Sequence, residues 1–204
     1  MLRKPLFAFV LIGAFATPAF GQTTLFDLMH RPAIAGTYVV GDWHALPAFE
    51  IEAYGVEISD ARNGAPGNFA ARVVAGTVRD LAEEKYDVFG IGIAHHRRLG
   101  NGPLSFRMGA EFTRADLAEG TFNEYALPFG FSASTDLLHL GIRLTPLVGL
   151  GASAYYNTIE EEIKVRNDGM VGLGVAHQKI VAGVLLKHHF TADQQFEWFL
   201  RYRF

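Results

Sequence analysis

Apolar and polar side chains alternate along several segments of the chain, most regularly at its C-terminal end. On an extended strand, one face there would carry Phe196, Trp198, Leu200, Tyr202 and Phe204, and the other Gln195, Glu197, Phe199, Arg201 and Arg203. The same period of two recurs at 49–54, 104–113, 138–145 and 171–176. This period is typical of β-strands with one apolar face, and a tilted strand of about ten residues can cross a bilayer.

Two features distinguish a membrane barrel from a soluble sandwich or lipocalin, whose strands also alternate. Aromatic residues lie near the ends of the apolar faces, where membrane barrels carry their interfacial girdles. The opposite faces combine glycine with charges of both signs. This mixture suits a narrow lumen, because glycine allows close curvature and opposite charges satisfy one another. The pattern therefore predicts an all-β fold, a transmembrane antiparallel up-and-down β-barrel of eight to ten strands.

Turn-forming residues divide this pattern into ten candidate strands. The candidate strands are 48–58, 69–79, 86–97, 104–113, 122–132, 136–145, 147–157, 169–177, 180–190 and 195–204. Boundary errors around 136–157 would reduce the count to eight. Pro128 removes a ladder donor, so the segment 122–132 is expected to be bulged or short. Residues 22–47 fit either a short amphipathic helix or an extra strand at 36–43.

The first 21 residues have the features of a secretory signal peptide. Arg3 and Lys4 provide a positive start, 5–15 is a short apolar run, and Ala19 and Gly21 fit the small positions of a cleavage site. The competing interpretation is a buried N-terminal helix of a soluble protein. The expected organisation is a signal peptide at 1–21, an undecided segment at 22–47 and a barrel at 48–204.

Composition removes several classes of function. The 204 residues include no cysteine and carry a formal net charge of −3. Without cysteine there are no disulfides, thiolate metal sites or thiol nucleophiles. Without a basic excess, nucleic acid is not an expected partner. The 50% hydrophobic content by itself would fit a globular core, but the period of two directs much of it outward.

The signal peptide, the alternating strands and the terminal sequence Leu-Arg-Tyr-Arg-Phe at 200–204 resemble those of small bacterial outer-membrane β-barrels. The resemblance implies a Gram-negative outer membrane, with membrane lipid and lipopolysaccharide around the barrel. It also implies that the barrel-assembly machinery recognises the strand ending in Phe204, and that both chain ends face the periplasm. Counting strands back from Phe204 then places 157–168, 59–68 and 98–103 outside the cell.

Charged residues on the predicted inner faces form a candidate ionic network in the lumen. Its members are Glu50, Glu52, Arg107, Glu111, Glu124, Arg143, Lys187, Glu197, Arg201 and Arg203. Such a set could line a pore or could pair and fill the lumen. With eight to ten strands the interior is just wide enough for side chains to fill, which favours the filled lumen.

The residues predict neither a metal site nor a cofactor. Four of the eight histidines form two adjacent pairs, His95-His96 and His188-His189. Neighbours along a strand point to opposite faces, so neither pair can chelate one metal ion. The Gly-x-Gly sequences at 90–92, 149–151 and 172–174 lie within predicted strands, so they do not form a nucleotide-binding turn.

A second, partial resemblance concerns outer-membrane lipid A 3-O-deacylases, which carry a His-x-Ser pair in the penultimate strand and an acidic residue in the last. Here His189, Thr191 and Glu197 occupy the matching places. In such a pair the imidazole can take the hydroxyl proton while the carboxylate orients the ring. The chain departs from that family in having threonine for serine, Ala192 for the following asparagine, and a shorter connection. Glu197 also falls on the lumen face, whereas that family's site faces lipid.

The sequence thus predicts an integral membrane barrel whose role is non-catalytic, in envelope integrity or in presenting loops. The alternative function is a lipid A-modifying hydrolase, and a third option is a narrow channel.

Overall fold

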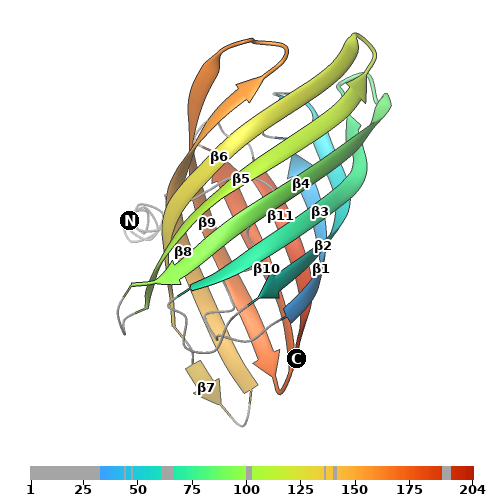
Figure 1. The fold of residues 1–204 in the computed structure, drawn as a ribbon. Helices are drawn as coiled ribbons and strands as arrows, with labels where there is room; N and C mark the ends of the chain where they lie inside the picture. The colour runs from blue at the N-terminus through green and yellow to red at the C-terminus, as the bar shows by residue number, and fades with distance from the viewer. Residues whose placement is uncertain are drawn as a thin grey trace, which may run out of the picture.

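The computed structural model describes residues 33–43, 45–46, 48–60, 67–99, 103–135, 137–139, 142–189 and 194–204, which form one antiparallel β-barrel (Figure 1). Its strands are β1 (Ala33–Asp42), β2 (Glu50–Asp60), β3 (Gly67–Arg79), β4 (Lys85–Arg98), β5 (Leu104–Leu117), β6 (Gly120–Ser134), β7 (Leu137–His139), β8 (Ile142–Asn157), β9 (Ile163–His177), β10 (Ile180–His189) and β11 (Gln194–Arg203). The predicted signal peptide lies outside the described residues.

Ten of these strands close the barrel, and each pairs with its neighbour in the chain except at two places. β1 pairs with β11, and β6 pairs with β8. The three-residue strand β7 pairs only with the start of β8 and forms a small hairpin beyond the barrel rim. The all-β, up-and-down antiparallel architecture predicted from the sequence is confirmed. In the described residues, no helix is long and apolar enough to cross a membrane.

The ten barrel strands differ from the ten candidates at two positions. Part of the undecided segment 22–47 forms β1, so the barrel begins before residue 48. The candidates 136–145 and 147–157 are not separate strands, because β8 runs unbroken through Pro146. Pro146 has a pairing partner in β9, Leu173, but lies beyond the end of the β6–β8 ladder.

Merging these two candidates reverses the direction of every strand before them. Ser59 lies opposite Ala33, which in turn lies opposite Arg203, so the β2–β3 connection is at the end of the barrel where the chain terminates. We call this the terminal end, and the opposite one the hairpin end. The β4–β5 connection also lies at the terminal end. The prediction that 59–68 and 98–103 lie on the same side of the membrane as 157–168 was therefore wrong, because the β8–β9 turn lies at the hairpin end.

Pro128 neither shortens nor bulges its strand. It sits inside β6, faces the interior, and lies opposite Ser153 of β8. On the other side, the β5–β6 ladder skips two pairs but resumes in the same register, from Met108–Phe129 to Glu111–Ala126. The missing donor of proline is thus accommodated by a local gap in one ladder.

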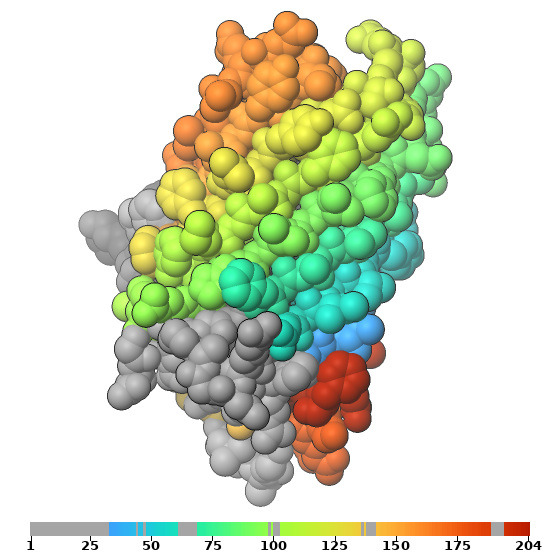
Figure 2. All heavy atoms as spheres, viewed as in Figure 1, coloured from blue at the N-terminus to red at the C-terminus, as the bar shows by residue number. Residues whose placement is uncertain are grey.

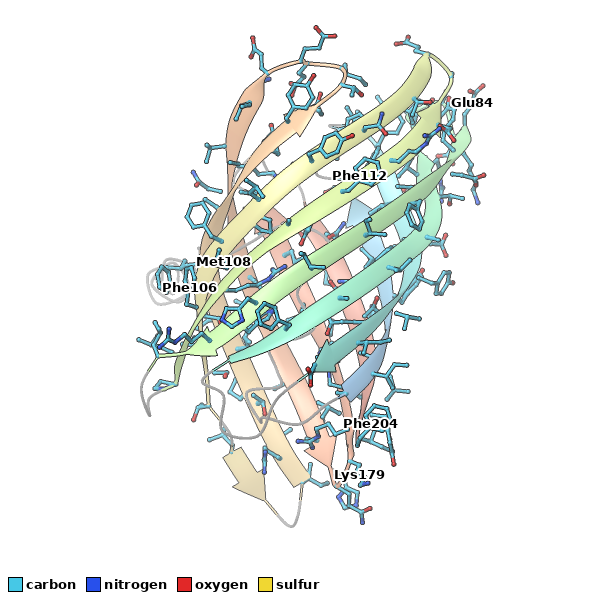
Figure 3. The ribbon with its side chains drawn as sticks, in the orientation of Figure 1. Glu84, Phe106, Met108, Phe112, Lys179 and Phe204 are labelled. Carbon is cyan, nitrogen blue, oxygen red and sulfur yellow. The ribbon has the colours of Figure 1, made fainter. Side chains whose placement is uncertain are left out.

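The outer face of the barrel is a continuous apolar belt. Phe106, Met108 and Phe112 point away from the wall of the barrel (Figure 3), as predicted for the apolar face of β5. On β4, the belt lies between the outward residues Asp87 and Arg97, ten residues apart. At about 3.3 Å per residue and a tilt of about 40°, this separation corresponds to about 25 Å, the height of the apolar band of a membrane barrel.

Aromatic rings concentrate near the two edges of this belt. Their ring-centroid separations are 4.9 Å for Tyr38–Tyr54 and 5.1 Å for Phe112–Tyr125 toward the hairpin end, and 5.2 Å for Phe106–Phe131 and 5.6 Å for Tyr202–Phe204 toward the terminal end. Large side chains from β3 to β6 cover the wall seen in Figure 2. Two aromatic zones about an apolar band are what a bilayer with two interfaces selects.

Candidate functional site: the filled interior

Two chemically different layers of side chains fill much of the interior, beside a second apolar cluster on β8 to β11 that consists of Leu147, Met170, Ala176, Val181, Leu185 and Phe199. The first, here called the ionic layer, contains the buried side chains Glu57, Arg72, Arg107, Glu111, Lys187, Glu197 and Arg201. The second, here called the apolar plug, lies at the hairpin end and contains Val39, Trp43, Ala45, Ile51, Ala53, Val74, Val78, Val88, Ala115 and Phe122. Together they determine whether anything can pass through or bind inside the barrel.

Glu197 is the centre of the ionic layer. It is fully buried on β11 and forms ion pairs with two cations, with Arg72 of β3 at 2.9 Å and with Lys187 of the adjacent strand β10. Arg72 also donates a hydrogen bond of 2.8 Å to the hydroxyl of Thr37 on β1. Side chains from non-adjacent strands therefore meet inside the lumen, which ties β3 to β1 and β11 in addition to the backbone ladders.

Two further pairs extend this layer. Arg201 of β11 bonds Glu57 of β2 at 2.6 Å, and Arg107 bonds Glu111 at 3.1 Å within β5. Each of these four side chains is almost completely buried. A buried charge is tolerated only when it is paired and hydrogen-bonded, so this arrangement fixes the geometry of the interior.

A third group lies nearer the hairpin end. The guanidinium of Arg166 on β9 donates two hydrogen bonds to the carboxylate of Glu124 on β6, at 3.2 and 3.4 Å. The same guanidinium carbon lies 4.4 Å from the centroid of the Tyr155 ring. Bidentate pairing combined with stacking on an aromatic ring immobilises an arginine effectively.

Most of the residues predicted for the lumen network face the interior. Arg107, Glu111, Glu124, Lys187, Glu197 and Arg201 form the ion pairs described above. Arg203 donates a 2.9 Å hydrogen bond to the backbone carbonyl of Gln178 at the terminal end, and Arg143 is half-buried near the start of β8.

Glu50 and Glu52 were wrongly assigned to the lumen. On β2 the inward residues are Ile51, Ala53 and Glu57, so both glutamates lie on the outer face. Glu52 there accepts a hydrogen bond of 3.2 Å from the Tyr38 hydroxyl. The reason is that Ile51 and Ala53 belong to the plug, where the interior itself is apolar.

Sequence reasoning also missed Glu57, Arg72 and Arg166. A signal for Glu57 was present: within 48–58, the apolar positions change from odd (Ile51, Ala53) to even (Val56, Ile58). An unbroken strand cannot change face, so this change of parity marks the level at which the interior changes from apolar to ionic.

The plug forms because the chain after β1 turns into the barrel mouth. Trp43 is fully buried there, and its ring packs edge-on against Phe122 of β6 at a centroid distance of 5.2 Å and against Phe49 at 6.1 Å. Backbone hydrogen bonds hold the turn, with the Trp43 N–H donating to the Phe49 carbonyl at 2.6 Å. Ala48 adopts a positive φ of 70°, which lets the chain reverse direction.

The structure does not place the three candidate catalytic residues together on a lipid-facing site. Glu197 is buried in the ionic layer, and its carboxylate is engaged by Lys187 and Arg72. Thr191 lies outside the described residues, and His189 is described only by its backbone pairing with Asp168. Glu197 therefore does not supply a carboxylate to the outer surface.

The two histidines of the first adjacent pair lie on opposite faces of the barrel wall. His95 points outward and its ring lies 4.6 Å from that of Phe69, whereas His96 is buried inside the barrel. His188 is exposed on β10. Among the described residues, no group of three or more His, Asp or Glu side chains is placed to hold a metal ion.

Comparison with known proteins gives structural likeness only. No protein-family model matches the chain, and no curated protein matches its sequence. The β domain of the Bordetella autotransporter BrkA is similar, with a TM-score of 0.49 and 14% identity over 86% of this chain and 100% of that one. LpxR from Salmonella typhimurium has a TM-score of 0.47 and 8% identity, over 84% of this chain and 100% of that one. The translocator domain of the autotransporter NalP from Neisseria meningitidis has a TM-score of 0.47 and 13% identity, over 85% and 88%. At these identities the likeness concerns the fold alone.

Proposed function

We propose that this protein is an integral outer-membrane β-barrel with a closed interior and a non-catalytic role, in envelope integrity or in presenting its hairpin end outside the cell. The observation that carries the proposal is the combination of an apolar outer belt with an interior filled by paired charges and an apolar plug. The belt is suited to a lipid environment, and among the described residues the paired charges and the plug obstruct the lumen at different levels.

The outward side chains support the proposed location in a membrane. Large apolar residues such as Ile91, Leu127 and Trp198 are exposed across the belt. Surfaces of this extent on a soluble monomer would aggregate. A closed barrel leaves no unpaired sheet edge, and it is therefore the form in which β-strands can span a hydrocarbon layer.

Cell fractionation tests this location. The mature protein should be recovered in the outer-membrane fraction and should migrate faster on a gel before heating than after it, because a folded barrel resists detergent until boiled. Recovery in soluble periplasmic extract, without a heat-dependent shift, would overturn the proposal.

Planar bilayer recordings separate a closed barrel from a narrow channel. The purified protein should insert without producing stable conductance steps, because the Arg72–Glu197–Lys187 group and the plug obstruct the lumen at different levels. Reproducible conductance steps from folded protein would favour the channel.

Lipid A analysis separates the proposed role from that of a lipid A hydrolase. Mass spectra of lipid A should be the same in cells that lack the protein, in cells that carry it, and in cells with His189→Ala or Thr191→Ala. A change in acylation that depends on His189 or Thr191 would establish the enzyme instead.

We also propose that the barrel-assembly machinery recognises the last strand. Phe204 is exposed and its ring packs at 81° to that of Tyr202, on the outer face of the terminal end. Phe204→Ser should reduce the amount of heat-modifiable barrel in cells while refolding of the purified chain in detergent stays normal. Equal losses in both assays would mean that Phe204 acts on folding alone.

A further inference from the structure

A cavity of about 470 Å³ opens at the hairpin end, above the plug. Four connections supply its walls: the turn before β2, the β3–β4 hairpin, the β5–β6 turn and the β8–β9 turn. Figure 3 marks this end of the barrel by Glu84. The volume lies within the range of small-molecule sites, and the cavity exists because the plug closes the lumen beneath it.

The floor of the cavity is apolar and partly aromatic. Leu46, Phe49, Tyr86 and Leu117 line it, and all four pack against the plug. The rings of Phe49 and Tyr86 have centroids 6.3 Å apart at an interplanar angle of 51°. Half-buried aromatic rings of this kind offer both apolar contact and a negative π-face.

Tyr86 has an unusual polar environment for a pocket residue. Its hydroxyl donates a hydrogen bond of 2.8 Å to a carboxylate oxygen of Glu84 and also lies 3.2 Å from a carboxylate oxygen of Asp80. The bond to Glu84 is the main cause that raises the pKa of Tyr86, followed by burial and the bond to Asp80. The phenol therefore stays protonated, and the two carboxylates keep the field at this ring negative.

The rim of the cavity carries negative charge without a cation in its lining. Of the residues that the structure describes, Asp80 and Glu119 both line it, and no Lys or Arg does. Among the described residues, Glu119 makes no ion pair, and it is exposed. Neighbouring cations are engaged by their own acids: Arg79 with Glu83 at 2.9 Å, Arg114 with Asp116 at 3.0 Å and Lys164 with Glu160 at 2.5 Å.

We propose that this cavity binds an organic cation, with an ammonium group at Glu119 and Asp80 and an apolar body against Phe49 and Tyr86. The carboxylates exclude anions. The apolar floor cannot hydrate an inorganic ion, and it also excludes strongly polar neutral solutes. An ammonium carried on an apolar group satisfies both surfaces, through ion pairing at the rim and cation–π contact at the floor.

Calorimetry on the refolded full barrel in a nonionic maltoside detergent tests the proposal with two matched probes. We expect 2-phenylethylammonium to bind saturably, and 2-phenylethanol, which keeps the apolar body without the charge, to bind about tenfold more weakly. The fluorescence of Trp43 can show whether a probe binds in this cavity, because the Trp43 ring contacts Phe49. The chain has two tryptophans, so Trp198→Phe on the lipid face leaves Trp43 as the only reporter.

Two variants distinguish binding in the cavity from general attraction of the probe to negative surface charge. Glu119→Gln should weaken binding of 2-phenylethylammonium about threefold to fivefold. Glu162→Gln, the same change on an exposed residue at the same end but outside the cavity lining, should change it less than about twofold. Equal binding of the two probes, equal effects of the two variants, or heats that do not saturate would overturn the proposal.

Discussion

The ionic layer and the apolar plug fill the same lumen by opposite physical means. In the ionic layer, Glu197 must meet Lys187 and Arg72 at hydrogen-bond distance, so the geometry is directional and each partner depends on the others. In the plug, Trp43, Ile51 and Phe122 fill volume, and close packing alone determines their arrangement. The difference teaches that the interior of this barrel is not uniformly polar, although an apolar belt surrounds the outside.

The ionic layer and the apolar plug should lose stability in different ways. Removing one partner of a buried ion pair leaves an uncompensated charge, whereas removing a plug side chain leaves a cavity. The ionic layer should therefore lose more stability per substitution, and the loss should be recoverable by removing the stranded partner as well.

The largest effect is expected at Glu197. Glu197→Ala strands Lys187 and Arg72 in the interior and should lower the free energy of unfolding by about 3–5 kcal/mol. Urea unfolding of the refolded barrel measures this value. Glu162→Ala, an exposed carboxylate at the hairpin end, is the control and should change it by less than about 0.5 kcal/mol.

A double variant sharpens this test. Replacing Glu197 by Gln and Lys187 by Met removes the carboxylate and one of its two cations. It should recover part of the loss, because only Arg72, which keeps its hydrogen bond to Thr37, is then left without its carboxylate. A double variant as unstable as Glu197→Ala would show that the stranded charge of Lys187 is not a main source of the loss.

In the plug, Ile51→Ala should lower the free energy of unfolding by about 2–3 kcal/mol, through lost apolar contact and the cavity left behind. The matched control is Ile58→Ala on the outer face of the same strand. It should cost less in the same denaturation experiment, because detergent or lipid fills the vacated space. An equal or greater loss at Ile58 would contradict the enclosed plug.

Two strand glycines distinguish the crowded inner face from the open outer face. A Cβ at Gly183 would lie 2.4 Å from the Phe199 ring and 2.6 Å from the backbone oxygen of Leu173, whereas a Cβ at Gly36 meets nothing within 4 Å. Gly183→Ala should therefore destabilise the barrel by about 1–2 kcal/mol. Gly36→Ala should be within about 0.5 kcal/mol of the parent in the same thermal unfolding assay. A larger loss for Gly36→Ala than for Gly183→Ala would mean that the residues around Gly183 can shift to make room for a Cβ.

The smallest effect is expected outside both layers, in the β8–β9 turn. Hydrogen bonds from Lys164 and from Asn157, at 2.8 Å, lower the pKa of Glu160. A lowered pKa in the folded state contributes stability above the ordinary pKa of glutamate, and this contribution is lost as the pH falls through the lowered value. Carboxyl-carbon NMR titration should show the Glu160 pKa return toward its ordinary range in Lys164→Met, and high salt should weaken the shift.

Much of the fold could be predicted from the chain because a β-strand has a period of two. The faces of β5, β9 and β11 follow directly from the alternation of apolar and polar residues. The predicted strand boundaries were wrong at Pro146, where the turn preference of proline competes with continuation of a strand. Pro146 has the chemistry of a turn, yet the ladder to β9 continues through it, and this single merger reversed the predicted direction of all earlier strands.

The candidate site was less predictable. Which charges face inward follows from parity, but which of them pair does not, since Arg72 and Glu197 are distant in the chain and meet only across the lumen. Glu50 and Glu52 were misplaced because the rule of a polar interior does not hold in the plug. The cavity above the plug is built from four connections, and its lining has no common pattern in the sequence.

By itself the sequence determined the class of fold and the apolar exterior, because alternation along a strand is a local property that every residue reports. Only the tertiary structure decided which strands meet at closure, how the charges pair and where the lumen is blocked. These depend on contacts between residues far apart in the chain, and no local period encodes them.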